Sequence, residues 1–271
     1  MFKINNLTYQ YDKTRKALDN VSMDFNKGDI IGIIGSNGSG KSTLFNNLMG
    51  ILKSTEGEIL YNGEQIKYDK KSLYNLRKEV GIVFQDPEKQ IFYSMVYDDI
   101  AFALRNIGID EKTIKERIHT ALEAVNGLQF IDRPVHNLSF GQKKRVAIAS
   151  VVAMENKLVL LDEPTAGLDP ISTRAIVDII KGLNKRGVKI VISSHDMNLI
   201  YEICDYVYVL NQGVLINEGT REEVFINEEK IDEAGLELPW LVKLHKNMGL
   251  PLFTREEDLY SYWNHREQKT V

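Results

Sequence analysis

Residues 30–45 have the sequence IIGIIGSNGSGKSTLF, and this stretch decides the fold. Its start, IIGII, is a short apolar run typical of a buried β-strand. The residues GSNGSGKS at 35–42 match the pattern G-x-x-x-x-G-K-[ST]. From Lys41 onward, KSTLFNNLMG predicts a helix that ends at Gly50. Because the pattern lies between a strand and a helix, it indicates a phosphate-binding loop rather than an incidental glycine-rich turn.

The chemistry of this loop suits a nucleotide polyphosphate. Glycines let backbone N–H groups turn toward phosphate oxygens, and the start of the helix adds its positive end. Lys41 is placed to offer a charge to the β- and γ-phosphates, and the Ser42 hydroxyl can bind Mg²⁺. We therefore expect the nucleotide site to contain Gly35, Ser36, Asn37, Gly38, Ser39, Gly40, Lys41, Ser42 and Thr43.

A second apolar run, KLVLLDE at 157–163, predicts a buried strand that ends in two carboxylates. Asp162, at the strand end, can hold Mg²⁺ through water beside the phosphate loop. Glu163 is then placed to orient or deprotonate an attacking water. Two solvated acids after a strand are the plain alternative, and the phosphate loop upstream favours the catalytic interpretation.

Two further polar residues follow predicted strands. Gln85 comes after GIVF, and His195 comes after KIVISS. The carboxyl ends of parallel strands meet at one edge of a sheet, where ligands collect, so both side chains are candidates for the same site. A lone histidine is more often a core or surface residue, and that interpretation is kept for His119, His136, His245 and His265.

Strands and helices alternate along most of the chain, which predicts an α/β fold with a mainly parallel sheet covered on both faces. Between about residues 86 and 155 the pattern is helical, which predicts an inserted helical subdomain. After residue 220 the strand pattern stops, so residues 221–271 form a predicted helical extension of a domain at 1–220. Asn62-Gly63 predicts a tight hairpin turn. The apolar residues at helical spacing in the inserted segment are Ile114, Ile118, Leu122 and Val125.

Composition narrows the functional classes. The chain has 271 residues, 43% of them hydrophobic, which is enough for a large core. The single cysteine, Cys204, excludes an internal disulfide and fits a reducing compartment. We expect a soluble, cytoplasmic protein, because neither a signal-peptide pattern nor an apolar run of roughly 18 residues is evident. The net charge of −4, without a basic stripe, argues against nucleic acid as a partner.

The stretch HNLSFGQKKR at 136–145 combines a helix start with an unusual charge pattern. Ser139 and Gln142 have the spacing of a capping box. Three cations then fill the first turn: Lys143, Lys144 and Arg145. The helix dipole is positive there, so each exposed cation costs about 0.3–1 kcal/mol. Helix formation alone does not explain them.

In order, the chain contains GSNGSGKST, a glutamine after a strand, LSFGQ, LVLLDE, GLD and a histidine after a strand. Across about residues 2–219 this series resembles the nucleotide-binding subunit of an ABC transporter. The resemblance implies a P-loop NTPase core of the RecA-like type, with an antiparallel β subdomain beside the mainly parallel sheet. It also implies an ATPase that binds ATP and Mg²⁺ and whose hydrolysis of ATP drives a membrane subunit.

The same resemblance implies roles for residues outside the phosphate loop. Tyr11 matches the aromatic residue that stacks on adenine; Tyr9 is a nearby competitor, which we expect to be a strand residue instead. Gln85 matches the glutamine that contacts Mg²⁺ or water and senses the membrane subunit. Asp169 matches the loop that couples the two sites of a dimer, and His195 matches the histidine that contacts the γ-phosphate.

LSFGQ resembles the signature that reaches the γ-phosphate held by a second subunit, through Ser139, Gly141 and Gln142. On this interpretation, the cations that follow supply positive potential toward that triphosphate. Phe140 stands where the family most often has glycine. We expect its side chain to pack against the helical subdomain, away from the phosphate.

Residues 84–104 and the tail at 234–251 resemble the energy-coupling factor ATPases, which drive uptake of cobalt, nickel or vitamins, and cobalt is suggested by analogy. The resemblance implies dimerisation through the tail and a peripheral location at the cytoplasmic face of the cell membrane. It implies three partners: a second ATPase subunit (the same chain or a paralogue), a transmembrane coupling protein and a substrate-binding membrane protein. Four apolar residues are candidates for an exposed partner site, with core packing as the alternative: Ile91, Phe92, Met95 and Val96.

Two other functional classes stay open. One is a soluble ABC protein. The single cassette argues against a translation factor, and the short segment at 50–138 argues against a DNA-maintenance protein, which carries a long coiled coil. Only the resemblance argues against the iron–sulfur assembly type. The other class is a nucleotide-gated scaffold without turnover, which would not need Glu163.

Overall fold

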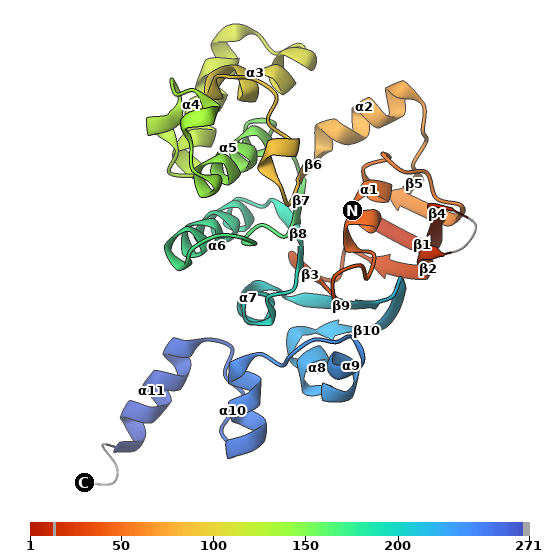
Figure 1. The fold of residues 1–271 in the computed structure, drawn as a ribbon, viewed down its shortest axis with the longest axis vertical. Helices are drawn as coiled ribbons and strands as arrows, with labels where there is room; N and C mark the ends of the chain where they lie inside the picture. Colours follow the sequence, from red (N-terminus) through yellow and green to blue (C-terminus); the bar gives the residue numbers. More distant parts are fainter. Residues whose placement is uncertain (13–14, 268–271) are drawn as a thin grey trace.

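The computed structural model describes residues 1–12 and 15–267. Its central sheet is formed by β3 (Ile30–Ile34), β6 (Val80–Val83), β7 (Leu158–Asp162), β8 (Lys189–Ser194), β9 (Tyr206–Asn211) and β10 (Val214–Thr220). The strands lie in the order β10-β9-β3-β8-β7-β6 (Figure 1). All neighbours pair in parallel except β10, which is antiparallel to β9. The predicted mainly parallel α/β sheet is confirmed.

A smaller antiparallel sheet has the order β2-β1-β4-β5, which confirms the antiparallel β subdomain. Its strands are β1 (Phe2–Gln10), β2 (Lys16–Asp24), β4 (Glu56–Tyr61) and β5 (Glu64–Gln65). Asn62 and Gly63 join β4 to β5 with φ angles of 52° and 84°, as the predicted hairpin turn requires. Tyr9 lies in β1, as expected, but the full length of β1 was not predicted, because its register against β2 shifts between Ile4 and Leu7 and breaks the alternation.

Helix α1 (Lys41–Leu48) follows β3, so the predicted strand–loop–helix unit is confirmed. The inserted segment contains α3 (Val96–Asn106), α4 (Glu111–Ala124) and α5 (Phe140–Ala153), which pack on one another at the top of Figure 1. The short 3₁₀ helices there are η1 (Pro87–Lys89), η2 (Leu128–Phe130) and η3 (Val135–Asn137). The remaining helices of the domain are α2 (Lys70–Glu79), α6 (Pro170–Lys185) and α7 (Met197–Ile203).

The expected exposed patch in the inserted segment is only partly present. Phe92 is 78% exposed, and Ile91 and Met95 are half-buried. Val96 is fully buried, so its interpretation as a surface residue is wrong. It is the first residue of α3 and belongs to the hydrophobic core of the inserted helices, where the core-packing alternative holds.

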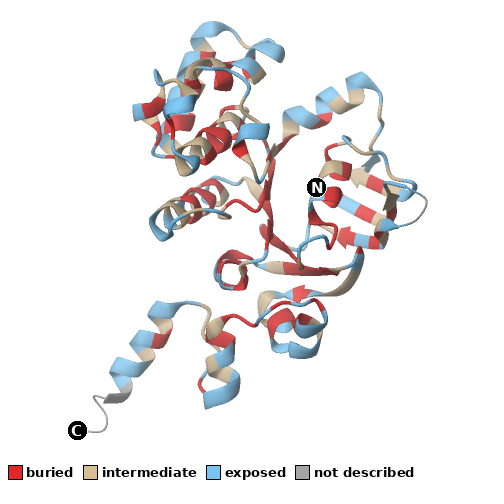
Figure 2. Cartoon of the chain, viewed as in Figure 1, coloured by how far each residue is buried: buried red, intermediate tan, exposed pale blue. Residues whose placement is uncertain are grey.

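Both faces of the central sheet are buried, as Figure 2 shows. Along β3, Ile30 and Ile34 join a hydrophobic cluster with α3 to α7, whereas Ile31 and Ile33 join a second cluster with α1 and the antiparallel sheet. Burial on both faces explains why this strand is a continuous apolar run rather than an alternating one. The strand ends are thereby held between two cores, which positions the loops that follow them.

The C-terminal extension is helical, as predicted, with α8 (Arg221–Ile226), α9 (Glu228–Glu233), α10 (Trp240–Met248) and α11 (Glu256–Glu267). Leu236, Leu241 and Leu250 are buried in the first hydrophobic cluster, so the extension packs against the domain. Within the described part of the chain, no helix combines the length and apolar character needed to cross a membrane.

Candidate nucleotide and catalytic site

The loop between β3 and α1 is shaped to face an anion. Helix α1 begins after Gly40, which has a φ of 109° and no side chain to cap the helix. A Cβ on Gly40 would lie 2.6 Å from the carbonyl oxygen of Ala17, so only glycine fits. The Ser39 hydroxyl is buried and has no hydrogen-bond partner among the described residues. A bound phosphate would accept hydrogen bonds from this hydroxyl and from the N–H groups in the first turn of α1. The loop therefore fits the predicted nucleotide.

Lys41 is buried beside this loop. Its Nζ donates hydrogen bonds to the carbonyl oxygens of Gly35 at 2.7 Å and Ser36 at 3.2 Å. The same Nζ lies 3.7 Å from Oε1 of Glu163. Burial lowers the pKa of Lys41, and the negative charges of Glu163 and Asp162 oppose that shift. Lys41 is therefore held at the loop by oxygen atoms, which phosphate oxygens can replace.

The parallel pairing of β7 with β8 fixes the two predicted acids. Asp162 lies opposite Ser193, whose Oγ donates to Oδ1 of Asp162 at 2.5 Å. The backbone N–H of Glu163 lies 3.1 Å from both the carbonyl oxygen and the hydroxyl of Ser193. Ser193 thus orients Asp162 and anchors Glu163. Sequence reasoning missed it, because a serine inside an apolar strand carries no signal until its partner strand is known.

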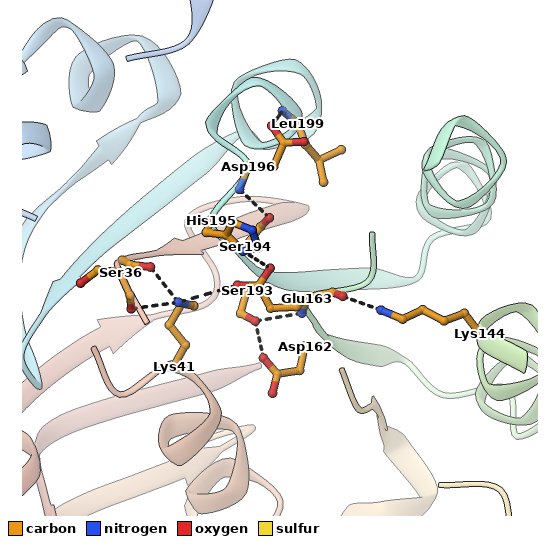
Figure 3. Close-up of polar contacts among 11 residues, drawn as sticks. Ser36, Lys41, Lys144, Asp162, Glu163, Ser193, Ser194, His195, Asp196 and Leu199 are labelled. Carbon is orange, nitrogen blue, oxygen red and sulfur yellow. Dashed lines mark hydrogen bonds and ion pairs between the residues drawn. The ribbon is translucent and has the colours of Figure 1, made fainter. Parts of the chain in front are cut away.

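Glu163 and His195 meet beyond the ends of β7 and β8 (Figure 3). Nδ1 of His195 lies 2.8 Å from Oε2 of Glu163. The Glu163 side chain is 7% exposed, whereas that of His195 is 58% exposed. The carboxylate therefore has Lys41 on one oxygen and His195 on the other. A water molecule that enters between Lys41 and His195 would meet the Glu163 carboxylate as a proton acceptor with a fixed orientation.

A cleft of about 440 Å³ opens over the phosphate loop. Tyr11, which is 64% exposed, lines it, and its hydroxyl lies 3.2 Å from Oγ1 of Thr43. Its ring packs edge-on against Tyr9, with 5.0 Å between centroids. The predicted residues brought together along this cleft are Tyr11, Asn37, Gly38, Ser39, Gly40, Lys41, Ser42, Thr43, Gln85, Asp162 and Glu163.

The cleft also has walls that sequence reasoning did not find. They come from the connection between β1 and β2, from the first residues of β2, and from the turn between β9 and β10. These residues match no motif, and only the fold brings them to the phosphate loop. They are Asp12, Arg15, Lys16, Ala17 and Gln212.

The signature residues do not line this cleft. Ser139 caps α5 and forms the predicted capping box with Gln142. A Cβ on Gly141 would lie 3.2 Å from Oγ of Ser172, and that hydroxyl donates to Asp169. The starts of α5 and α6 are therefore neighbours, and Ser139 and Asp169 are exposed there. The fold thus brings the signature and Asp169 together on a second surface.

The three cations after the signature each have a partner in the same chain. Lys143 pairs with Glu88 at 2.5 Å, and Arg145 donates to a backbone carbonyl at 3.1 Å. Lys144 is fully buried, and its Nζ donates to the carbonyl oxygen of Glu163 at 2.6 Å. Burial lowers the pKa of Lys144 to about 8. These contacts account for the cations, so the charge pattern alone does not point to an external anion.

The expected position of Phe140 is wrong. Phe140 is 41% exposed, and its side chain does not enter the core of the helical subdomain. A Cβ on Gly167 would lie 3.4 Å from the ring, and Nζ of Lys144 lies 5.8 Å from its centroid. Phe140 is the first residue of α5, so its ring projects at the helix end, toward the loop before α6.

Comparison with known proteins agrees with this geometry. Residues 18–166, more than half of the chain, match the family model described as ABC transporter. The chain belongs to the ABC transporter family. It is 50% identical to a putative ABC transporter ATP-binding protein of Listeria monocytogenes, over 97% of this chain and 98% of that protein. It is 45% identical to the cobalt import ATP-binding protein of Salmonella typhimurium, over 99% and 97%.

Solved structures of the family have the same fold. The protein cbiO1 of Clostridium perfringens, described as part of the ABC transporter complex cbiONQ, is 41% identical with a TM-score of 0.78, over 90% of this chain and 98% of that one. This ABC protein is therefore a P-loop ATPase that binds ATP.

Proposed function

We propose that this ABC ATPase energises a membrane importer of the energy-coupling factor type, with cobalt or a related micronutrient as cargo. The cobalt import relative supports this, as does an energy-coupling factor transporter ATP-binding protein of Methanocaldococcus jannaschii, which is 45% identical over 88% of this chain and 85% of that protein. The observation that carries the proposal is an apolar groove beside the inserted helices. The named relatives, rather than the groove, favour a membrane importer over an iron–sulfur assembly ATPase or a scaffold.

The groove has a volume of about 560 Å³ and lies between α2, β6, α3 and α5. Phe92 and Phe102 line it and are 78% and 41% exposed. Asp99 accepts hydrogen bonds from the N–H groups of Phe92 and Tyr93, so the Phe92 ring projects from a fixed loop, whereas Phe102 lies on α3. Exposed aromatic side chains around a groove are typical of a protein–protein interface. The transmembrane coupling protein is the partner that we propose for it.

In the nucleotide cleft, adenine would stack on Tyr11 and the phosphates would contact residues 35–43. Ser42, Asp162 and Gln85 would hold Mg²⁺, together with phosphate and water oxygens. When bound, Mg²⁺ offsets negative charge on the phosphates. The donor types suit this ion, because each of the three side chains offers an oxygen.

Hydrolysis depends on the pair at the strand ends. Glu163 would orient or deprotonate the attacking water, and His195 would contact the γ-phosphate while holding Oε2 of Glu163. Lys41 would leave the carbonyls of Gly35 and Ser36 for the β- and γ-phosphates. These groups act by position and charge, which is what phosphoryl transfer needs.

Two ATPase subunits, identical or paralogous, would complete each other's sites. Ser139 is exposed at the positive start of α5, so a second subunit's γ-phosphate can meet it together with Gly141 and Gln142. Asp169, beside this surface, would couple the two sites. A dimeric ATP-binding cassette with ADP and phosphate supports this arrangement; it is 28% identical with a TM-score of 0.73, over 82% of this chain and 99% of that one. The extension at 221–271 would add contacts between subunits.

Purification of the tagged chain from its native membrane tests this function. We expect a transmembrane coupling protein and a small substrate-binding membrane protein to copurify with the chain, which would bind them at the cytoplasmic face of the membrane. Phe92→Asp should lose both while the purified subunit still hydrolyses ATP. Val214→Asp is the matched control, since Val214 is 43% exposed on β10 and lies outside both the groove and the C-terminal extension. Recovery of soluble partners alone would contradict the proposal, and normal cobalt uptake without the chain would exclude that cargo.

A further inference from the structure

Lys144 is a fully buried lysine whose charge serves no surface contact. It lies on α5, and Figure 3 shows it reaching across to the loop after β7. There its Nζ donates a hydrogen bond of 2.6 Å to the backbone carbonyl of Glu163. The bond therefore joins the helix that begins with the signature to the residue proposed as the catalytic base.

Glu163 needs such support because its backbone is strained. Its φ is 48°, in the left-handed region that residues other than glycine rarely adopt. A conformation of this kind costs of order 1–3 kcal/mol and persists only where its surroundings impose it. Ser193 holds the N–H of Glu163. The Glu163 carbonyl accepts the 2.6 Å bond from Lys144 together with a longer bond of 3.2 Å from the N–H of Ala166. Both peptide groups that flank the Glu163 side chain are thus tied to other elements.

Stability alone does not explain a lysine at this position. Burial of an ammonium group is costly, and an apolar side chain of similar length would fill the same space without that cost. Burial also lowers the pKa of Lys144, which expresses the same penalty. The ring of Phe140 lies 5.8 Å from Nζ and partly compensates through a cation–π contact. A buried charge of this cost, with its only side-chain hydrogen bond among the described residues directed at Glu163, points to a role in the site.

We propose that Lys144 is a positioning residue that holds the backbone of Glu163 so that its carboxylate stays aligned with His195 and the phosphate cleft. The inference rests on the proposed role of Glu163 as the base. Ser139 caps the same helix, so the hydrogen bond from Lys144 connects the signature surface to Glu163 of the same chain. A displacement of α5 would therefore move the carbonyl of Glu163.

The test compares Lys144→Met, Lys144→Arg and Glu163→Gln in the full-length chain. Lys144→Met should lower kcat of ATP hydrolysis by about 10- to 100-fold, since a small misplacement of a catalytic group has that effect. KM for ATP should change less than about threefold, because Lys144 does not line the cleft. Lys144→Arg keeps a donor for the Glu163 carbonyl and should restore most of kcat.

Lys189→Met is the matched control. Lys189 also donates to a backbone carbonyl, that of Gly28 at 3.0 Å, but at the opposite end of β8. It should leave kcat within about twofold of the wild type. Thermal unfolding checks that each variant is folded. If Lys144→Met does not fold, Lys144→Gln replaces it. The glutamine side chain is shorter by one atom and cannot reach the Glu163 carbonyl, so the same loss of kcat is expected.

A double variant separates positioning from a general structural effect. If Lys144 acts through the Glu163 carboxylate, Lys144→Met should not further slow the residual hydrolysis by Glu163→Gln. An equal loss in both backgrounds would overturn the proposal, as would wild-type kcat in folded Lys144→Met or failure of Lys144→Arg to restore it. Normal hydrolysis by Glu163→Gln would instead refute the proposed base, which is a different outcome.

Discussion

Replacement of Glu163 by glutamine should separate the binding of ATP from its hydrolysis. The amide has the size of the carboxylate it replaces. The backbone of residue 163 is held independently of its side chain, through Ser193 on one side and Lys144 on the other. The change therefore removes a proton acceptor and a negative charge while keeping the shape of the site.

The structure sets the expected size of the two effects. A positioned general base contributes about 10²- to 10⁴-fold, or about 3–5 kcal/mol of activation free energy. ATP affinity should not fall. Oε1 of Glu163 is 3.7 Å from Nζ of Lys41, a gross attraction of about 4 kcal/mol at an effective dielectric constant of about 20. Loss of that carboxylate charge frees Lys41 for phosphate and removes repulsion from the γ-phosphate.

Three measurements check this prediction. Phosphate release in a single turnover should slow at least about 100-fold, and binding of a fluorescent ATP analogue should stay equal or become tighter. Size-exclusion chromatography with ATP and Mg²⁺ should show an accumulated dimer. Glu79→Gln is the control, because Glu79 bonds to Tyr61 and Lys157 at the opposite end of the sheet. Hydrolysis by Glu163→Gln at the wild-type rate would refute the assignment of the base.

Three further changes test the site and its scaffold. Lys41→Ala should weaken ATP binding at least about tenfold in a nucleotide titration, because the phosphates lose their nearest cation; unchanged affinity would remove Lys41 from the site. Ser193→Ala frees Asp162, so the Mg²⁺ concentration for half-maximal hydrolysis should rise about tenfold, whereas an unchanged midpoint would make Ser193 dispensable. Gly81→Ala puts a Cβ 2.2 Å from Cγ1 of Val151, so the free energy of unfolding, measured in urea, should fall by about 1–3 kcal/mol. Wild-type stability would mean that the surrounding core accommodates the methyl group without strain.

Features that depend on neighbours along the chain were predictable. The strand, loop and helix around Lys41, the hairpin turn at Asn62 and Gly63, and the capping box of Ser139 all rest on residues a few positions apart. The full length of β1 was not predicted, because register shifts against β2 break its alternating pattern. The predicted position of the Phe140 side chain was wrong. A residue at a helix start can face either the helical subdomain or a neighbouring loop, and sequence spacing does not distinguish the two.

The sequence alone determined which chemistry this protein carries. Lys41, Asp162 and Glu163 could be recognised because a phosphate loop and an acidic strand end are contiguous patterns. Only the tertiary structure decided what holds those groups in place. Ser193 reaches Asp162 through the parallel pairing of β7 with β8, and Lys144 reaches Glu163 through the packing of α5. Such hydrogen bonds join residues far apart in the sequence, so they exist only once strand order and helix packing are set.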